Sequence, residues 1–163
     1  MNIRYAQPSD LVHINGLINY YIKNTNVNLE YNPLTIKEQT IWYEKHKGIY
    51  PIIVAEKDGK FIGFASLSQL FTKRGFLRSA ELSIYIKPEQ RGKGIGIGLM
   101  EKIIEIARNE GIIKNIVSLI TSDNDASIKL HKKMGFEETG CYKNVAEKFN
   151  EIVDVSIFQL FLQ

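Results

Sequence analysis

The 163-residue sequence has little of what marks several protein classes. Its single cysteine, Cys141, excludes an internal disulfide framework and a multi-cysteine zinc site, and it fits a reducing compartment. No run approaches the roughly 20 apolar residues of a membrane span. The polar opening residues 1–10 lack the apolar segment of a secretion signal. We therefore expect a cytoplasmic protein without a membrane partner.

A strong excess of one charge is also missing. The chain has 21 Lys and Arg against 18 Asp and Glu, for a formal net charge of +3. A nucleic-acid-binding protein usually has far denser basic clusters, so we expect no nucleic-acid partner, and a small anionic ligand would satisfy the mild excess. His13 and His46 have no Glu-x-x-His companion, so no metal is expected.

The pattern of hydrophobic residues predicts one domain over residues 1–163, because the chain has no internal repeat and a chain of this length usually builds one core. Strand-like patterns occupy residues 3–6, 52–56, 61–67, 80–86, 115–121, 136–146 and 152–162. Helical spacing occupies residues 11–21, 35–48, 99–111 and 124–135. This order predicts an α/β (α+β) fold with a mixed, mostly antiparallel sheet of about seven strands flanked by about four helices.

Local signals support three of these elements. Lys57-Asp58-Gly59-Lys60 is a strong hairpin signal between two strands. Thr35 and Glu38 have the spacing of a capping box at the start of a helix. In the strand at 80–86, Glu81, Ser83 and Tyr85 alternate with apolar residues, so these three side chains share one face.

The glycine-rich turn at residues 90–98 is the most informative segment. Gly92, Gly94 and Gly96 let the backbone approach a ligand, and the helix that follows this turn offers free N–H groups and a positive dipole end. Arg91 and Lys93 add full positive charges, so the turn predicts a pyrophosphate site. A loop that merely turns the chain is the alternative interpretation.

Two common nucleotide motifs do not fit this turn. A Walker A loop needs Ser or Thr after Gly-Lys, whereas Lys93 precedes Gly94. The Rossmann fingerprint needs a third glycine three positions after the second, where Ile97 and Leu99 stand. The spacing therefore excludes a P-loop for ATP or GTP and disfavours NAD.

The turn and a downstream block resemble the GCN5-related N-acetyltransferase (GNAT) superfamily. Arg91, Gly94 and Gly96 form R-x-x-G-x-G, and Asn124-Asp125-Ala126-Ser127 and Leu130 to Phe136 resemble that superfamily's N-x-x-[AS] and L-[YH]-x-x-x-G-F elements. The resemblance covers residues 3 to about 160. Local features resemble the phosphinothricin and methionine sulfoximine acetyltransferase branch: Ile18-Asn19-Tyr20, Asn24-Thr25, Trp42, Tyr50-Pro51, Ala80-Glu81 and Leu130-His131.

The resemblance implies acetyl-CoA as co-substrate and assigns roles to several residues. Glu81 is the implied catalytic base, because an alkylammonium with a pKa near about 10 must lose a proton before it can attack. His131 stands where many members have a tyrosine that protonates the leaving thiolate. Cofactor contacts are implied for the loop residues Arg91, Gly92, Lys93, Gly94, Ile95 and Gly96, the strand residues Leu82, Ser83, Ile84, Tyr85 and Ile86, and Asn124 and Ser127. An oxyanion-binding N–H is implied at a bulge near residues 82–85.

Ordinary structural roles compete with these assignments. A strand glutamate can simply face solvent, a helical histidine is often a packing residue, and Asn124 can act as a helix N-cap. Cys141 is expected to be buried in a strand rather than nucleophilic.

The implied acceptor is a small amino-acid-like amine of the phosphinothricin or methionine sulfoximine/sulfone type, acetylated by direct attack in a ternary complex. Tyr31, Ser83 and Arg78 are the expected substrate-binding residues. The branch has an arginine where Phe71 stands here, and one of Lys73, Arg74 and Arg78 could replace it; a solvated charge cluster is the alternative interpretation of these three. The sequence also departs from the branch at Glu147, Asn150 and Ile152.

Two other functions remain open on the sequence. One is acetylation of a protein N-terminus or lysine, and the other is a non-catalytic acyl-CoA sensor. A homodimer through the C-terminal strands is expected from the apolar residues Phe158, Leu160 and Phe161, which core burial would explain equally well.

Overall fold

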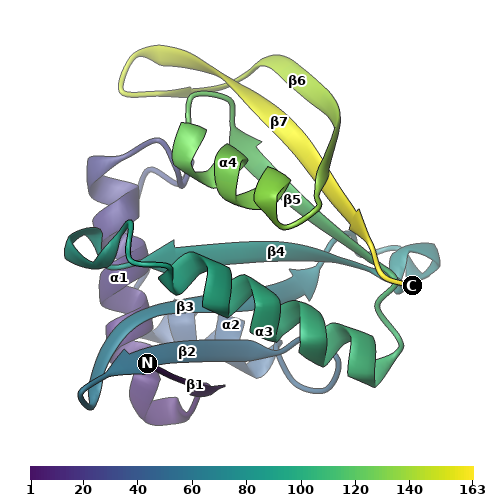
Figure 1. The fold of residues 1–163 in the computed structure, drawn as a ribbon. Coiled ribbons are helices and arrows are strands. Elements are labelled where there is room, and N and C mark those ends of the chain that lie inside the picture. Colours follow the sequence, from purple (N-terminus) through teal and green to yellow (C-terminus); the bar gives the residue numbers. More distant parts are fainter.

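The computed structural model describes residues 1–163 and contains one seven-stranded sheet in the order β1-β2-β3-β4-β5-β7-β6 (Figure 1). The strands are β1 (Asn2–Tyr5), β2 (Ile52–Lys57), β3 (Lys60–Gln69), β4 (Ser79–Ile86), β5 (Asn115–Thr121), β6 (Glu137–Lys148) and β7 (Glu151–Phe161). The helices are α1 (Leu11–Asn24), α2 (Ile36–Glu44), α3 (Ile95–Glu110) and α4 (Asp125–Lys133). Only the β4–β5 pair is parallel, so the predicted mixed, mostly antiparallel sheet is confirmed.

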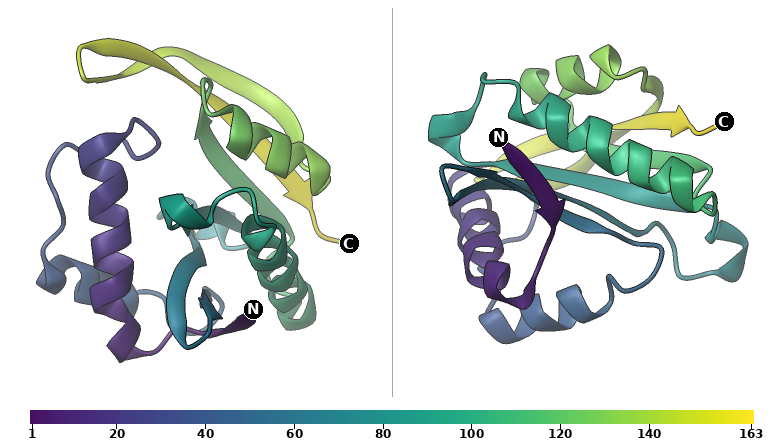
Figure 2. Two further views of the ribbon diagram at one scale, coloured as in Figure 1. Left: turned by 60° about the vertical axis from the view of Figure 1, so that its left-hand side comes forward. Right: turned by 60° about the horizontal axis from the view of Figure 1, so that its bottom comes forward.

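The sheet separates two hydrophobic clusters, and Figure 2 shows α1 and α3 on its opposite sides. Ile14, Ile22 and Phe64 belong to the cluster beneath α1, whereas Leu82 and Leu99 belong to the cluster beneath α3. Period-two alternation along β4 therefore sends neighbouring side chains into different cores. No helix is both long and apolar enough to cross a membrane.

The predicted capping box and the predicted hairpin turn are both present in the structure. The Thr35 hydroxyl accepts a hydrogen bond from the Glu38 N–H at 3.2 Å, and the Glu38 carboxylate accepts one from the Thr35 N–H at 2.7 Å. This capping box starts α2. Asp58 and Gly59 both have positive φ, 52° and 71°, which suits the two-residue hairpin between β2 and β3.

Two helix boundaries differ from the prediction. Helix α3 begins at Ile95 rather than near residue 99, because Ile95 is buried one turn before Leu99 and extends the apolar stripe across the glycines. Helix α2 ends at Glu44, several residues before Gly48. The last glycine of the turn therefore does not mark the start of α3, and Gly48 does not mark the end of α2, whereas Gly111 is the C-cap of α3 as predicted.

The pairing of β4 is unequal on its two edges. Against β3 it is regular from Ala80 to Ile86, whereas against β5 it is confined to Ser79, Ala80 and Glu81. Beyond Glu81 the two strands diverge, as Figure 1 shows. The expected bulge at residues 82–85 is absent, and the departure of β5 leaves main-chain groups of β4 unpaired instead.

Candidate active site

A large cavity lies where β4 and β5 diverge. It has a volume of about 1080 Å³ and is lined by 33 residues. They come from the end of α1 and the segment after it, β4, the glycine-rich turn, β5, α4, β6 and β7. A cavity of this size, at a break in a sheet, is suited to a ligand as large as a cofactor.

The glycine-rich turn forms one wall of the cavity. Gly92 and Gly94 have φ of 73° and 79°, in the left-handed region that favours glycine, and a Cβ at either position would meet nothing within 4 Å. Gly94 is the N-cap of α3 and has no side chain to occupy the first N–H groups of that helix. Free donors at the start of a 16-residue helix are suited to binding an anion.

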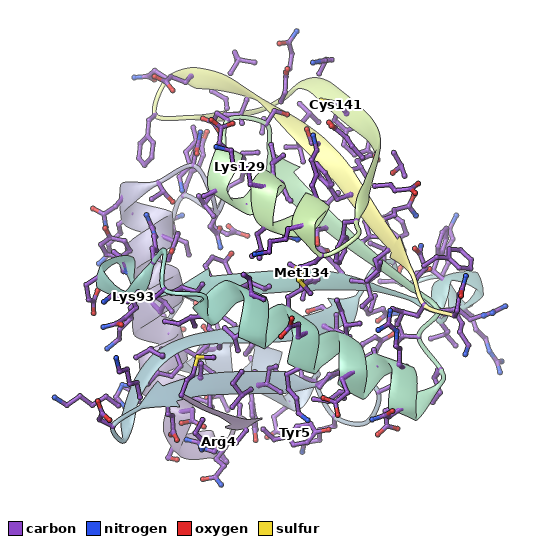
Figure 3. All side chains as sticks on the ribbon, in the orientation of Figure 1. Arg4, Tyr5, Lys93, Lys129, Met134 and Cys141 are labelled. Atoms are coloured by element: carbon purple, nitrogen blue, oxygen red, sulfur yellow. The ribbon has the colours of Figure 1, made fainter.

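The two basic residues of the turn point in different directions. The Arg91 Nε donates to the Tyr21 hydroxyl at 3.2 Å, its guanidinium lies 5.1 Å from the Tyr21 ring, and it lines the cavity. The Lys93 Nζ instead donates to Glu89 O at 2.8 Å, and Lys93 does not line the cavity. Figure 3 shows Lys93 at the outer edge of the molecule. The structure thus brings the other five predicted loop residues to the cavity and not this one.

The exposed edge of β4 forms a second wall, and all five predicted residues from Leu82 to Ile86 line it. The Lys87 N–H donates to Ile62 O of β3 at 2.9 Å. Because main-chain groups alternate along an antiparallel ladder, the groups of Ile84 and Ile86 face the gap left by β5. The Ile86 carbonyl already accepts a hydrogen bond from the Tyr21 hydroxyl at 2.7 Å. The Ile84 groups and the Ile86 N–H are therefore the ones that can bond to an extended ligand lying along the strand.

Glu81 occupies the point where the two strands separate. Its side chain lines the cavity, and burial raises the pKa of its carboxyl above the ordinary value. No protein donor hydrogen-bonds to the carboxylate, so nothing opposes this effect of burial. A carboxyl in this state is a stronger base than an exposed one.

His131 is 4% exposed and both of its ring nitrogens are engaged. Nδ1 lies 2.8 Å from Ser127 O, and because a carbonyl only accepts, Nδ1 carries the proton. Nε2, 2.9 Å from the Ser118 hydroxyl, is then the acceptor, and burial lowers the pKa of the ring. These contacts favour a neutral histidine that fixes α4 against β5 over a proton donor to the thiolate.

The other α4 residues named by the sequence also reach the cavity. Asn124 and Ser127 both line it, and the Asn124 Oδ1 accepts a hydrogen bond from the Ser127 N–H at 3.2 Å. The N-cap role of Asn124 is therefore present, and its position at the cavity leaves its amide nitrogen available to a ligand.

Of the three expected substrate-binding residues, only Ser83 lines the cavity. The Tyr31 hydroxyl instead donates to Glu147 O, and Tyr31 is 64% exposed. Arg78 is exposed beside the start of β4, where its carbonyl accepts from the Lys114 N–H at 2.8 Å. Phe71 packs on Phe76, with ring centroids 4.8 Å apart, outside the cavity.

Sequence reasoning missed a buried lysine behind this site. Lys148, near the tip of the β6–β7 hairpin, is 3% exposed, and its Nζ donates to Ile22 O at 2.7 Å and to Asn28 O. The Asn28 amide in turn donates to the Tyr85 hydroxyl at 3.1 Å. The segment 25–30, of which Thr25 and residues 27–30 line the cavity, is therefore held by the hairpin.

A buried hydroxyl also escaped the sequence. Thr121, at the end of β5, is 4% exposed, lines the cavity and has no hydrogen-bond partner in the protein. The side chains of the chain form no group of three or more His, Cys, Asp or Glu residues that could hold a metal ion.

Comparisons with known proteins agree with this geometry. The model of the acetyltransferase (GNAT) family matches residues 18–136. An L-methionine sulfoximine/L-methionine sulfone acetyltransferase of Pseudomonas aeruginosa is 35% identical over 99% of this chain and 94% of its own length.

Two solved structures share the fold. An N-acetyltransferase from Staphylococcus aureus has a TM-score of 0.95 and 36% identity, over 99% of this chain and 98% of its own. A phosphinothricin acetyltransferase from Sinorhizobium meliloti in complex with acetyl-CoA has a TM-score of 0.95 and 29% identity, over 99% of this chain and 88% of its own. The chain therefore belongs to the GNAT family of acetyltransferases.

Proposed function

We propose that this chain transfers the acetyl group of acetyl-CoA to the amino group of a small amino-acid-like substrate, such as methionine sulfoximine, methionine sulfone or phosphinothricin. The observation that carries the proposal is that one cavity is lined by both the glycine-rich start of a helix and the half-buried carboxyl of Glu81. The names of the relatives support the donor and the class of acceptor.

The donor binds along two walls of the cavity in this proposal. The N–H groups from Arg91 to Gly96 hold its pyrophosphate, with the Arg91 guanidinium adding charge. The pantetheine arm runs along the main-chain groups of Ile84 and Ile86, and Asn124 contacts it from α4. This arrangement leads the thioester from the glycine-rich turn toward Glu81.

Glu81 acts as the general base. It takes a proton from the substrate ammonium, directly or through one water, and the freed nitrogen attacks the thioester carbonyl. The new C–N bond forms and the C–S bond breaks, with the thiolate leaving and then taking up a proton. No acyl-enzyme is needed, because a thioester held in line with the amine reacts by orientation and by N–H donors aimed at the developing oxyanion.

His131 and the acceptor residues enter the proposal with revised roles. His131 positions α4, since both of its nitrogens are already bonded. Ser83 contacts the acceptor together with Asn28 and Glu30, which line the cavity, whereas Tyr31 and Arg78 do not line it.

Domain extent, location and assembly also form part of the proposal. The chain works as one domain over residues 1–163, in the cytoplasm, where a lone thiol stays reduced. It forms a homodimer through the outer surface of the C-terminal strands. Phe161 is 76% exposed and Ile152 61% exposed on β7, whereas Phe158 is fully buried and belongs to the core.

A panel of amines tests the proposed acceptor. The purified chain is mixed with acetyl-CoA and with each of methionine sulfoximine, methionine sulfone, phosphinothricin, the natural amino acids and short peptides, and release of the CoA thiol is followed. Turnover of one or more of the small amino-acid analogues is expected. Turnover of peptides alone would favour protein acetylation, and acetyl-CoA binding without any turnover would favour a sensor.

A further inference from the structure

We propose that Lys129 and Lys133 of α4 bind the 3′-phosphate of the donor, so that the chain selects CoA over the form of CoA that lacks this phosphate. The inference rests on the proposed function, in which acetyl-CoA is the donor. CoA carries two separate anionic groups on one ribose, a 5′-diphosphate and a 3′-phosphate. The glycine-rich turn and Arg91 bind the diphosphate in that function, and the 3′-phosphate needs cations of its own.

The two lysines lie on one face of α4. A set of cavity-lining residues follows helical spacing along this helix: Ala126, Lys129, Leu130 and Lys133. Spacings of i, i+3, i+4 and i+7 place side chains on the same face of a helix. His131 marks a different face, because its ring bonds to the Ser118 hydroxyl of β5. At 3.6 residues per turn, the lysine face therefore points away from β5.

Leu130 shows what lies beside this face. A Cβ on Gly96, in the first turn of α3, would lie 3.0 Å from the Leu130 Cδ2. The first turn of α3 carries the free N–H groups that bind the diphosphate in the proposed function. Lys129 and Lys133 border Leu130 on the helix surface, and each carries its ammonium on a flexible four-carbon stem. Since the 3′-phosphate is one ribose away from the diphosphate, cations on this adjacent helix are placed to meet it.

Both ammonium groups are free to take a ligand. None of the ion pairs of the structure includes Lys129 or Lys133. Asp125, the acidic residue of α4, stands one turn before Lys129 and does not pair with it. Figure 3 shows Lys129 on α4, whereas Lys93 lies on the turn, where its Nζ already donates to Glu89 O. The lysines of α4 are therefore the unpaired ammonium groups at the cavity.

The charge of the ligand matches this pair. A phosphate monoester carries about −1.5 to −2 charges at neutral pH. Two ammonium groups one helical turn apart can neutralise it and donate charge-assisted hydrogen bonds to its oxygens. A ligand without the 3′-phosphate keeps the diphosphate and the pantetheine arm but leaves these donors unused.

Calorimetry on the full chain tests the proposal with CoA and 3′-dephospho-CoA as ligands. The parent is compared with Lys129→Met, Lys133→Met and the double variant. The parent should bind CoA at least about 10-fold more tightly than 3′-dephospho-CoA, as expected for charge-assisted contacts. Each single variant should lose part of this preference and the double variant most of it. The affinity for 3′-dephospho-CoA should stay the same in all of them.

Lys132→Met is the matched control. Lys132 is exposed and lies in the same last turn of α4, but it does not line the cavity. Its substitution removes the same charge from the same helix end, so it reports any effect of net charge or of the helix dipole. The preference for CoA should survive in Lys132→Met. Added salt should reduce the preference in the parent, because the ammonium groups are exposed.

Every outcome decides the proposal. Equal affinity of the parent for the two ligands would overturn it and leave acetyl-CoA as the donor. So would a preference that persists in the double variant, or one that Lys132→Met removes to the same extent. A lower affinity of the double variant for 3′-dephospho-CoA, equal to its loss for CoA, would place the lysines elsewhere on the donor and also overturn it. Binding of neither ligand to the parent would reject the proposed function together with the lysine site.

Discussion

The two edges of β4 contrast in a way that explains where the site lies. Toward β3, the strand is paired through Ile86, and its side chains complete two hydrophobic clusters. Toward β5, the pairing ends at Glu81, and the same strand lines a cavity. The edge toward β3 therefore contributes stability, whereas the edge toward β5 leaves main-chain groups and the carboxyl of Glu81 at the cavity. The loss of a few ladder pairs is what makes room for a ligand.

The largest expected effect comes from a substitution of Glu81, at the edge of β4 that faces β5. We call this the open edge and the edge paired with β3 the closed edge. Glu81→Gln removes the base and keeps the shape of the side chain. We expect kcat to fall by about 100-fold or more, the usual contribution of a general base, with the affinity for acetyl-CoA unchanged. Steady-state kinetics and calorimetry on the same preparation check both. Unchanged turnover would show that another group takes the proton.

The second change removes the anion site of the open edge. Gly94→Val places a β-branched residue at φ 79° beside the free N–H groups. Affinity for acetyl-CoA should fall at least about 10-fold, equivalent to about 1.4 kcal/mol. Gly48→Val is the matched control, because Gly48 has φ 80° and lies away from the donor cavity. Equal losses of affinity in both variants would point to general strain.

The third change addresses the closed edge. A Cβ on Gly63 of β3 would lie 2.7 Å from Tyr85 O, a main-chain atom that cannot easily move. Gly63→Ala should lower the free energy of unfolding by about 1–3 kcal/mol, the usual cost of overpacking. Gly16→Ala, with nothing within 4 Å of its Cβ, is the control. Denaturant unfolding measures both variants.

The fourth change loosens the segment that covers the open edge. Lys148→Met would leave the carbonyls of Ile22 and Asn28 without this donor. KM for the amine should rise by a few-fold while kcat changes little, because residues 25–30 lose their anchor to the hairpin. The exposed Lys143, which pairs with Asp154, provides the control Lys143→Met. Unchanged KM in Lys148→Met would show that the segment needs no such anchor.

The smallest expected effect is the dependence of stability on pH. Burial raises the pKa of folded Glu81 above its unfolded value. Its contribution to stability is therefore fully present below the unfolded pKa and is lost as the pH rises through the folded pKa. Glu81→Gln is neutral throughout, so at neutral pH its Tm should exceed that of the parent by about 1–2 °C.

A carboxyl that is hydrogen-bonded and paired with a lysine provides a contrast to Glu81. The pKa of Asp154 is lowered by a hydrogen bond from the Asn144 N–H and by Lys143. The Tm of Asp154→Asn should therefore be lower than that of the parent at neutral pH, opposite to the change expected for Glu81→Gln. The Tm difference between Glu81→Gln and the parent should vanish at low pH, where Glu81 is protonated in the folded and unfolded states. A Tm difference that persists at low pH would show that burial of the ionised carboxyl is not its cause.

The sequence predicts the elements of this fold better than it predicts the site. Strand and helix positions follow from the period of neighbouring residues, and the glycine-rich turn follows from residues within one short segment. The split between β4 and β5 has no such local signal. It depends on where two strands far apart in the chain cease to pair, and the expected bulge was the wrong explanation for the free main-chain groups.

The hydrogen-bond partners of several side chains could not be predicted from the sequence. Lys93 bonds back to its own turn, and the nitrogens of His131 are bonded to Ser118 and Ser127. The contact of Lys148 with Ile22 spans 126 residues of chain. These hydrogen bonds depend on the three-dimensional arrangement of the chain and not on the local residue pattern. The sequence could therefore identify candidate residues but not the groups that they contact.

Calorimetric titration of acetyl-CoA into the purified chain tests the central claim most directly. We expect one saturable binding event per chain, retained in Glu81→Gln and weakened in Gly94→Val. If neither CoA nor acetyl-CoA gives a heat of binding, the donor site does not lie where β4 and β5 separate. The same conclusion would follow if Gly94→Val left the affinity for acetyl-CoA unchanged.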